Sequence, residues 1–298
     1  MFVVVGGQIF YVERCYMERS SFVIPLSVVL LGAAMLLAHP NRASAEVLYG
    51  ATTAGQLIQI DTDTGAGTLV GNIGFGGIEA IDSLSNGTLV GIANANQLIE
   101  IDTNTGAGQL IGTVTGFAWV EGLAYSSSDD VLYGSATVGP QADANRLITI
   151  DPATAQPTSI APSFFGPNFW DVDGLAVSAA GALLGSHINT NPSLFSVNSV
   201  SGMGTQIGTL SMAVVGLDFA ADGTLYGVTI PNIQVGGPSR LVTVDPMSGA
   251  IQDIGPIGFD TIQAIAFVVP EPSGLALLGF GTLGVLRHRF ARTRRRRD

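Results

Sequence analysis

The stretch Ile78–Gly112 reads IEAIDSLSNGTLVGIANANQLIEIDTNTGAGQLIG and contains four short apolar runs. The pair Asn86-Gly87 separates the first run from the second, and the sequence DTNTG separates the third from the fourth. Aliphatic and β-branched runs separated by Asn, Asp and Gly are typical of strands joined by hairpins. The stretch therefore predicts a four-stranded antiparallel unit.

The same unit recurs about five times along the chain. The first run recurs as IEAID, VEGLA, VDGLA, VGLDF and IQAIA, and the third as LIQID, LIEID, LITID, LFSVN and LVTVD. The second run contains a glycine in each copy, with spacings of 41, 43, 51 and 42 residues between Gly50, Gly91, Gly134, Gly185 and Gly227. A four-stranded module repeated at this period is typical of a β-propeller blade.

The phase of the repeat predicts how the ring closes. The first unit begins at its second run, Val47–Gly50, and the missing first run follows the last unit as Ile262–Phe267. A C-terminal strand that completes the first blade would leave only short, protected sheet edges. We therefore predict an all-β propeller over residues 46–268 with five four-stranded blades, or six if the longest interval contains a degenerate blade.

Residues 1–45 have the parts of a secretory signal peptide. An apolar core, Phe22–Ala38, follows Arg19, and the small-x-small site Ala43-Ser44-Ala45 predicts cleavage before Glu46. The expected structure is a signal helix, and Met17 is the expected start of translation. An uncleaved anchor helix is the alternative.

The composition of the body excludes several kinds of chemistry. Residues 46–268 contain nineteen Asp and Glu and two basic residues, Arg146 and Arg240, so their net charge is about −17. This charge would repel the phosphate backbone of nucleic acid. The body contains no Cys and no Lys, and its one histidine is His187. These counts exclude a Cys–His pair, a Schiff-base lysine and a multi-histidine zinc site.

The last thirty residues differ sharply from the body. The box Val269-Pro270-Glu271-Pro272 is followed by an apolar, glycine-containing segment, Ser273–Leu286, and then by seven arginines. An apolar segment ended by a cationic cluster predicts a membrane helix with a cytoplasmic C-terminus, although fourteen residues are short for a span.

These three ordered parts resemble the PEP-CTERM sorting signal. The resemblance implies that an exosortase-type enzyme cleaves at or near Pro270–Pro272, in a Gram-negative bacterium that makes exopolysaccharide. It also implies a precursor anchored in the inner membrane and a product at the cell surface or in the extracellular matrix. The resemblance covers residues 269–298 and implies nothing about the activity of the body.

The loops with the pattern DTDTG at 61–65 and DTNTG at 102–106 resemble half of a calcium-binding loop. Their counterparts DPMSG at 245–249 and NSVSG at 198–202 do not keep calcium ligands. We interpret the pattern as a turn in which Asp accepts hydrogen bonds from the next residues and Gly adopts a positive φ.

One position of the innermost strand predicts a candidate site. Aligned on the first run, this position reads Glu79, Glu121, Asp173, Val215 and Gln263. The innermost strands of a propeller line its axis, so these carboxylates would converge there. They would raise one another's pKa or hold a hard cation such as Ca²⁺, or they would line a solvated channel.

The loops that enter these strands are aromatic, and they contain both tryptophans of the chain. The aromatic residues are Phe75, Phe117, Trp119, Phe164, Phe165, Phe169, Trp170 and Phe259. Exposed rings beside carboxylates and amides would suit the faces and hydroxyls of sugars. The alternative is that the rings pack between blades.

The sequence as a whole favours a non-catalytic binding or structural role, with a glycan or protein partner at the mouth of the channel and no required cofactor. The main alternative is a calcium-dependent hydrolase of the lactonase type, with calcium held by Glu79, Glu121 and Asp173. That alternative depends on fold-level analogy alone.

Overall fold

The computed structural model describes residues 2–5, 8–11, 46–138, 145–160, 172–188, 191–230 and 238–269. The chain divides into two units, Met1–Ala43 and Ser44–Asp298. In the first, strands β1 (Phe2–Val5) and β2 (Gln8–Tyr11) form an antiparallel pair. The predicted signal helix, its cleavage site at Ala43 and Ala45, the box residues Pro270, Glu271 and Pro272, and the predicted membrane helix lie outside the described residues.

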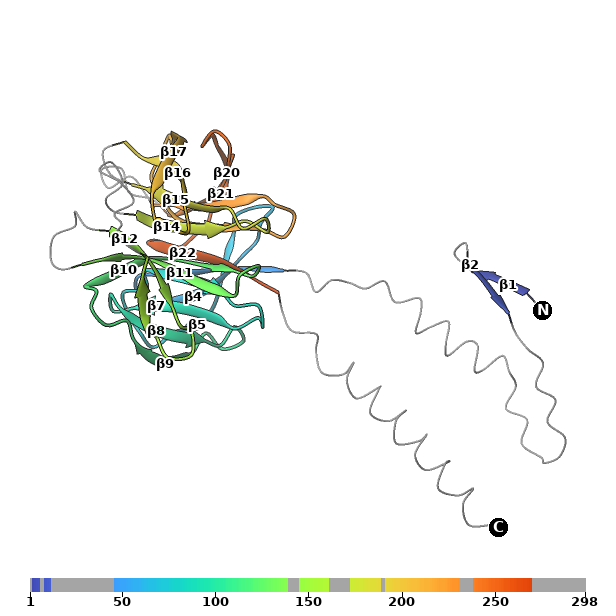
Figure 1. Ribbon diagram of the computed structural model, residues 1–298, viewed down its shortest axis with the longest axis horizontal. Coiled ribbons are helices and arrows are strands. Elements are labelled where there is room, and N and C mark those ends of the chain that lie inside the picture. Colours follow the sequence, from blue (N-terminus) through green and yellow to red (C-terminus); the bar gives the residue numbers. More distant parts are fainter. Residues whose placement is uncertain are drawn as a thin grey trace, which may run out of the picture. The chain divides into compact units, whose positions relative to one another are not determined.

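The second unit contains five four-stranded antiparallel sheets, which are the blades of a propeller (Figure 1). Blade 1 consists of β22 (Ile262–Val268), β3 (Val47–Thr52), β4 (Gln56–Ile60) and β5 (Gly67–Asn72). Blade 2 consists of β6 (Ala80–Ser83), β7 (Leu89–Ala93), β8 (Gln97–Ile101) and β9 (Gly108–Thr113). Blade 3 consists of β10 (Trp119–Ser126), β11 (Val131–Thr137), β12 (Asn145–Ile150) and β13 (Pro157–Ser159).

Blade 4 consists of β14 (Val172–Val177), β15 (Leu183–His187), β16 (Ser193–Val197) and β17 (Gly204–Thr209). Blade 5 consists of β18 (Val214–Phe219), β19 (Leu225–Thr229), β20 (Arg240–Val244) and β21 (Ile251–Pro256). In every blade the strand named first is the innermost one. The five-bladed propeller predicted from the repeat is confirmed.

The ring closes through the last strand of the body. Strand β22 pairs antiparallel with β3, in a register that runs from Ile262 opposite Thr52 to Val268 opposite Val47. The same strand packs between the inner strands β18 and β6 of the neighbouring blades. The closure predicted from the phase of the repeat is therefore confirmed.

The hydrophobic core is divided into five clusters, and each cluster lies between two neighbouring blades. For example, Leu123 and Val120 of blade 3 share a cluster with Val90 of blade 2, and Leu175 of blade 4 shares one with Tyr133 of blade 3. The apolar face of each sheet is thus buried by the next sheet in the ring. The cluster that contains both Leu48 of blade 1 and the residues of blade 5 exists only because the ring is closed.

The turns with the DTNTG pattern are capped as the turn interpretation requires, which confirms it. In the second blade, Oδ1 of Asp102 accepts hydrogen bonds from the backbone N–H of Asn104 at 2.7 Å and of Thr105 at 3.2 Å. These bonds lower the pKa of Asp102. Gly106 closes the turn with a φ of 77°. Asn198 accepts the same two hydrogen bonds in blade 4.

The same turns press against the outermost strand of the preceding blade at a glycine. A Cβ added to Gly71 of β5 would lie 2.0 Å from the carbonyl oxygen of Thr105, and one added to Gly208 of β17 would lie 1.8 Å from that of Ser248. Gly255 of β21 meets Thr64 of the first blade in the same way, at 2.2 Å. The repeat therefore uses glycine here because the next blade approaches too closely for a side chain.

We predict that Gly208→Ala lowers the free energy of unfolding by about 1–3 kcal/mol, because the new methyl group must displace the backbone of the next blade. Chemical denaturation of the variant and the wild type measures this difference. Gly76→Ala is the matched control, since a Cβ at Gly76 would meet no atom within 4 Å and this glycine has no positive φ. Equal loss in both variants would contradict the packing role of Gly208.

Candidate functional site

A β-bulge marks the predicted site position in four of the five inner strands. The register of the inner pair shifts around Glu121, Asp173, Val215 and Gln263. In blade 2 the equivalent residue, Glu79, lies just before β6, and its backbone N–H donates to the carbonyl of Ile92 at 3.0 Å. A bulge adds one unpaired residue and redirects its side chain. The repeat thus gives each blade one extra residue near the axis.

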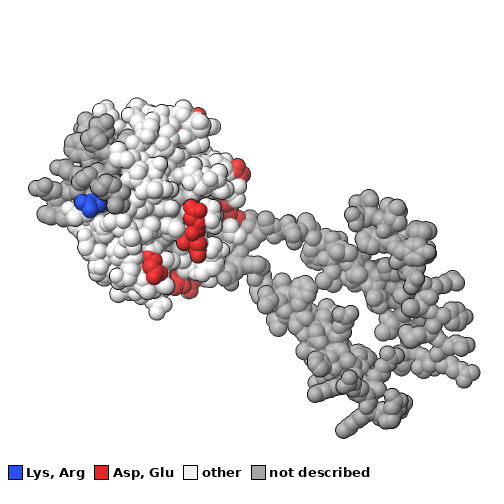
Figure 2. Space-filling model, viewed as in Figure 1, with Lys and Arg blue, Asp and Glu red and all other residues white. Residues whose placement is uncertain are grey.

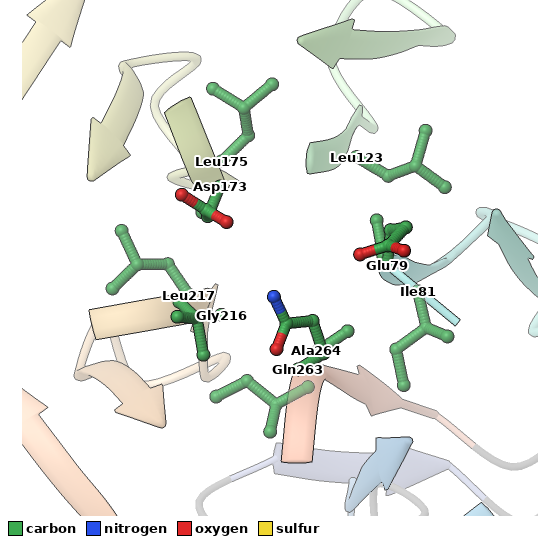
Figure 3. A pocket seen from close by; sticks show the side chains of 13 residues that line it. Glu79, Ile81, Leu123, Asp173, Leu175, Gly216, Leu217, Gln263 and Ala264 are labelled. Carbon is green, nitrogen blue, oxygen red and sulfur yellow. The ribbon is translucent and has the colours of Figure 1, made fainter. Parts of the chain in front are cut away.

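Three of these side chains meet at the axis of the ring. Glu79, Asp173 and Gln263 line a cavity of about 10 Å³ together with Val215. Figure 3 shows the carboxylates of Glu79 and Asp173 and the amide of Gln263 pointing toward this space. The volume is close to that of one water-sized probe. Burial raises the pKa of Glu79.

The third predicted carboxylate is held elsewhere. Oε2 of Glu121 accepts a hydrogen bond from the side-chain amide of Asn145 at 2.9 Å, and the hydroxyl of Thr137 donates to the same amide at 2.7 Å. Glu121 is not among the residues that line the axial cavity. The described part of the chain holds no group of three or more His, Cys, Asp or Glu arranged to bind a metal ion.

A buried aliphatic side chain lies two residues further along each inner strand, at the same position in all five blades. These residues are Ile81, Leu123, Leu175, Leu217 and Ile265. Each is only 2–4% exposed, and four of them are labelled around the cavity in Figure 3. Each of the five belongs to a different hydrophobic cluster between neighbouring blades. All five positions keep a branched aliphatic residue because each side chain is packed into such a cluster.

A much larger pocket, of about 240 Å³, lies at the other end of the inner strands. All five inner strands contribute the residue at one equivalent position to its wall: Ser83, Tyr125, Val177, Phe219 and Phe267. Its rim is formed by the turns that follow these strands and by Glu46 and Val269, which are the first and last described residues of the propeller. We call this cavity the mouth pocket.

Two aspartates in the wall of the mouth pocket, the buried Asp82 and the partly buried Asp218, were not predicted as site residues. Asp82 accepts hydrogen bonds from the backbone N–H of Ser83 at 2.6 Å and of Tyr125, in the next blade, at 2.5 Å. Asp218 accepts from Phe219 at 2.7 Å and from Phe267, again in the next blade, at 2.6 Å. Each aspartate therefore links two neighbouring inner strands.

The sequence contained a signal for this pair. Asp82 and Asp218 occupy the same position of the first run, where the other three blades have Ala124, Ala176 and Ala266. A carboxylate at an otherwise apolar, buried position of a repeat is costly unless it is hydrogen-bonded. Comparison of the five copies of the first run at each position would have identified Asp82 and Asp218 as exceptions.

The aspartate pair has an unusual protonation behaviour. Burial raises the pKa of Asp82 to about 7, although its hydrogen bonds to Tyr125 and Ser83 act in the opposite direction. Burial also raises the pKa of Asp218, and the negative charges of Asp82 and Glu46 add to this effect. The wall of the mouth pocket thus contains two coupled acidic groups that keep their protons to a higher pH than ordinary aspartates.

Positive charge is scarce in the described part of the propeller. Its two arginines are Arg146 and Arg240, and neither lines the mouth pocket. Arg240 forms an ion pair with Asp253, with Nε donating to Oδ1 at 2.7 Å, between strands β20 and β21. Figure 2 shows acidic side chains spread over one face of the propeller and basic atoms at a single place.

The aromatic candidates have different surroundings. Phe75, Phe117 and Phe259 are partly buried and pack against core clusters between blades, as the packing alternative predicts. Trp119, the first residue of β10, is 43% exposed and stays a candidate for ligand contact. Phe164, Phe165, Phe169 and Trp170 lie outside the described residues.

The C-terminal residues decide how the chain is sorted. Residues 268–296 match the family model of the PEP-CTERM protein-sorting motif. The chain carries a PEP-CTERM sorting signal. This motif implies that the protein is exported and processed by an exosortase-type enzyme. Among the described residues, no helix has the length and apolar character that a membrane crossing requires. No curated protein sequence matches the chain.

Solved structures of low sequence identity resemble the propeller. The PQQ-bound aldose sugar dehydrogenase of Streptomyces coelicolor is 14% identical, with 74% of this chain and 81% of that one covered and a TM-score of 0.46. Regucalcin, a calcium-binding protein of Agrobacterium tumefaciens, is also 14% identical, with 77% and 76% covered and a TM-score of 0.46.

A third structure comes from work on the de novo evolutionary emergence of a symmetrical protein. It is 15% identical, with 76% of this chain and 100% of that one covered and a TM-score of 0.49. Likeness at this level supports no inference about ligand or activity.

We predict that Leu175→Ala lowers the free energy of unfolding by about 2–5 kcal/mol, because it opens a cavity in the hydrophobic cluster between blades 3 and 4. Leu69→Ala is the matched control, since Leu69 lies on the outer strand β5 and is 48% exposed. Urea denaturation of both variants provides the measurement. A Leu175 variant as stable as the Leu69 variant would contradict the tight packing of this cluster.

Proposed function

We propose that the mature protein is a non-catalytic binding module at the cell surface or in the extracellular matrix, with a glycan or protein partner held in the mouth pocket. The observation that carries this proposal is the pocket itself. Its volume of about 240 Å³ lies near the range of small-ligand sites, whereas the axial cavity of about 10 Å³ has room for a single water-sized group.

The chemistry of the pocket wall suits a sugar. The hydroxyl-bearing residues Ser83, Ser85 and Ser127 line it together with the rings of Phe219 and Phe267. Serine hydroxyls both donate and accept hydrogen bonds, and aromatic rings pack against the apolar faces of sugars. An exopolysaccharide of the producing cell is therefore the ligand that we propose first. The acidic character of the described surface argues against nucleic acid as a partner.

The same geometry favours binding over hydrolysis. In the mouth pocket, both oxygens of Asp82 and of Asp218 already accept backbone N–H groups, which is a structural use of a carboxylate. In the axial cavity, Glu79 and Asp173 meet without Glu121, and there is no room beside them for an organic substrate. The calcium-dependent hydrolase is therefore the less favoured alternative.

The mouth pocket lies next to the start of the sorting motif. Val269 lies at the pocket rim, and the PEP-CTERM motif begins one residue earlier, at residue 268. The C-terminal arm that the sorting enzyme processes therefore leaves the propeller beside the pocket. Trp119 begins an inner strand and so lies at the opposite end of the ring. Its exposed ring makes that end the second candidate surface for a partner.

We predict that Ala179→Trp weakens binding of the protein to the exopolysaccharide of the producing cell at least tenfold, because the indole would fill the pocket rim. Ala180→Trp is the matched control, since both alanines are exposed and belong to the same turn but only Ala179 lines the pocket. Sedimentation of the protein with the purified polysaccharide, with and without added calcium, measures the affinity.

Trp119→Ala is the second variant, because it distinguishes binding at the mouth pocket from binding at the opposite end of the ring. Loss of binding in Trp119→Ala with normal binding in Ala179→Trp would move the site to the opposite end. No saturable binding by the wild type would contradict the glycan proposal and leave a protein partner as the remaining ligand.

A further inference from the structure

The polar groups in the wall of the mouth pocket are divided between its two sides. Blades 5, 1 and 2 are neighbours in the ring, and they contribute three carboxylates: Asp218, Glu46, which precedes β3, and Asp82. The described wall residues of blades 3 and 4 include the hydroxyl-bearing Ser127 and Ser178 and no carboxylate. One side of the pocket is therefore acidic, and the opposite side presents neutral hydroxyl groups.

The hydrogen bonds of the three carboxylates favour their ionised forms. Each oxygen of Asp82 and of Asp218 accepts a backbone N–H group, at distances between 2.5 and 2.7 Å. Glu46 accepts the backbone N–H of Ala221, in blade 5, with both of its oxygens at 3.0 Å. Hydrogen bonds of this kind stabilise the anion of a carboxylate. They therefore hold negative charge in the wall of the pocket.

The described wall contains no group that balances this charge, since none of its residues is Lys, Arg or His. Burial raises the pKa of Asp218, and the negative charges of Asp82 and Glu46 add to this effect, so the three groups are near enough to repel one another. A cation in the pocket would attract all three, and its binding and their ionisation would favour each other. The pocket is therefore electrostatically complementary to a positively charged ligand.

Aromatic side chains on the acidic side also suit a cation. Phe219 follows Asp218 directly, and Tyr125 is the residue whose backbone N–H donates to Asp82. Both aromatic residues line the pocket and are only partly buried. The face of an aromatic ring attracts an ammonium group, and the attraction is stronger where water is excluded. Rings beside carboxylates therefore favour an ammonium group over a neutral polar group.

We propose that the mouth pocket binds a sugar unit with a free amino group, whose ammonium lies on the side of blades 5, 1 and 2 and whose hydroxyls lie toward blades 3 and 4. The volume of about 240 Å³ suits a single unit of a longer chain. This inference rests on the proposed glycan binding and narrows the ligand to a cationic glycan. A basic side chain of a protein would match the acidic side but would leave the hydroxyls of Ser127 and Ser178 unused.

The test is titration calorimetry of the full-length protein in detergent at pH 7 with three β-1,4-linked tetrasaccharides, made of glucosamine, N-acetylglucosamine or glucose. They share one backbone and differ in whether each ring carries an amino, an acetamido or a hydroxyl group at its second carbon. We expect the glucosamine tetramer to bind at least about tenfold more tightly than the other two. This advantage should shrink as the salt concentration rises from about 20 to about 500 mM, because salt screens the attraction.

Glu46→Gln assigns the preference to the pocket. The substitution removes one charge from the rim and leaves an amide oxygen that can accept the N–H of Ala221. We expect the variant to bind the glucosamine tetramer about fivefold more weakly, with an unchanged melting temperature. Glu100→Gln is the matched control, since it removes the same charge from an exposed residue of β8 that does not line the pocket.

Equal affinity for the three tetramers would overturn the inference. Equal loss of affinity in Glu46→Gln and Glu100→Gln would also overturn it, because the preference would then come from the acidic surface as a whole. A tetralysine peptide that binds in the pocket as tightly as the glucosamine tetramer would indicate a basic protein segment instead of a sugar.

Failure of this inference can be distinguished from failure of the proposed glycan binding. If the exopolysaccharide of the producing cell binds saturably and Ala179→Trp weakens that binding, while the three tetramers bind equally, only the amino group is rejected. If neither the exopolysaccharide nor any tetramer binds, glycan binding itself is rejected and the inference with it.

Discussion

The pairing of β22 with β3 is the constraint on which the rest of the structure depends. Each blade buries its apolar face only against the next blade, so the core consists of five clusters rather than one. Three of these clusters could form in an open row of blades, because they contain no residue of β22. The fourth, between blades 1 and 2, includes Ala264, Ala266 and Val268 of β22. The fifth, between blades 5 and 1, needs the C-terminal strand to reach the N-terminal one. Residues 46–268 contain no cysteine, so no disulfide within the propeller replaces this contact, and ring closure holds the domain together.

The fold was predictable because every blade requires the same residue types at the same positions, so the requirement is visible as a sequence repeat. Glycine in the second run, Asp or Asn in the turn and branched aliphatics in the inner strand each serve the same purpose in every blade, and so they recur. Even the closure could be predicted, because the displaced run Ile262–Phe267 has no partner within its own unit. The bulges around residues such as Asp173 were harder to predict, since a shift of register leaves the pattern of residue types unchanged.

The candidate site was predictable only in part. The sequence brought Glu79, Asp173 and Gln263 together correctly at the axis, but it could not show that Glu121 would turn to Asn145, because that contact depends on the path of a neighbouring strand. Nor could it show how small the axial cavity is. The mouth pocket arises from five residues of different character, and no common motif marks it. Positions where the repeat varies, such as Asp82 and Asp218, carried the missing information.

These observations describe a scaffold with two distinct ends. One end has the exposed Trp119 and a small polar cavity, and the other has the mouth pocket and the root of a PEP-CTERM sorting arm. Export and sorting follow from the motif, whereas the proposed binding rests on the mouth pocket, to which the closing strand contributes Phe267.

The most direct test of this account is to move the closing strand. A protein that lacks Ile262–Val268 should lose cooperative unfolding in calorimetry, because blade 1 loses its inner strand and two core clusters are exposed. A second protein, with the same seven residues placed before Glu46 and joined by a copy of the Ser83–Leu89 turn, should regain it, since blades 2 to 5 already connect their inner strands in this order. Normal melting of the first protein, or no recovery in the second, would contradict ring closure as the basis of the fold.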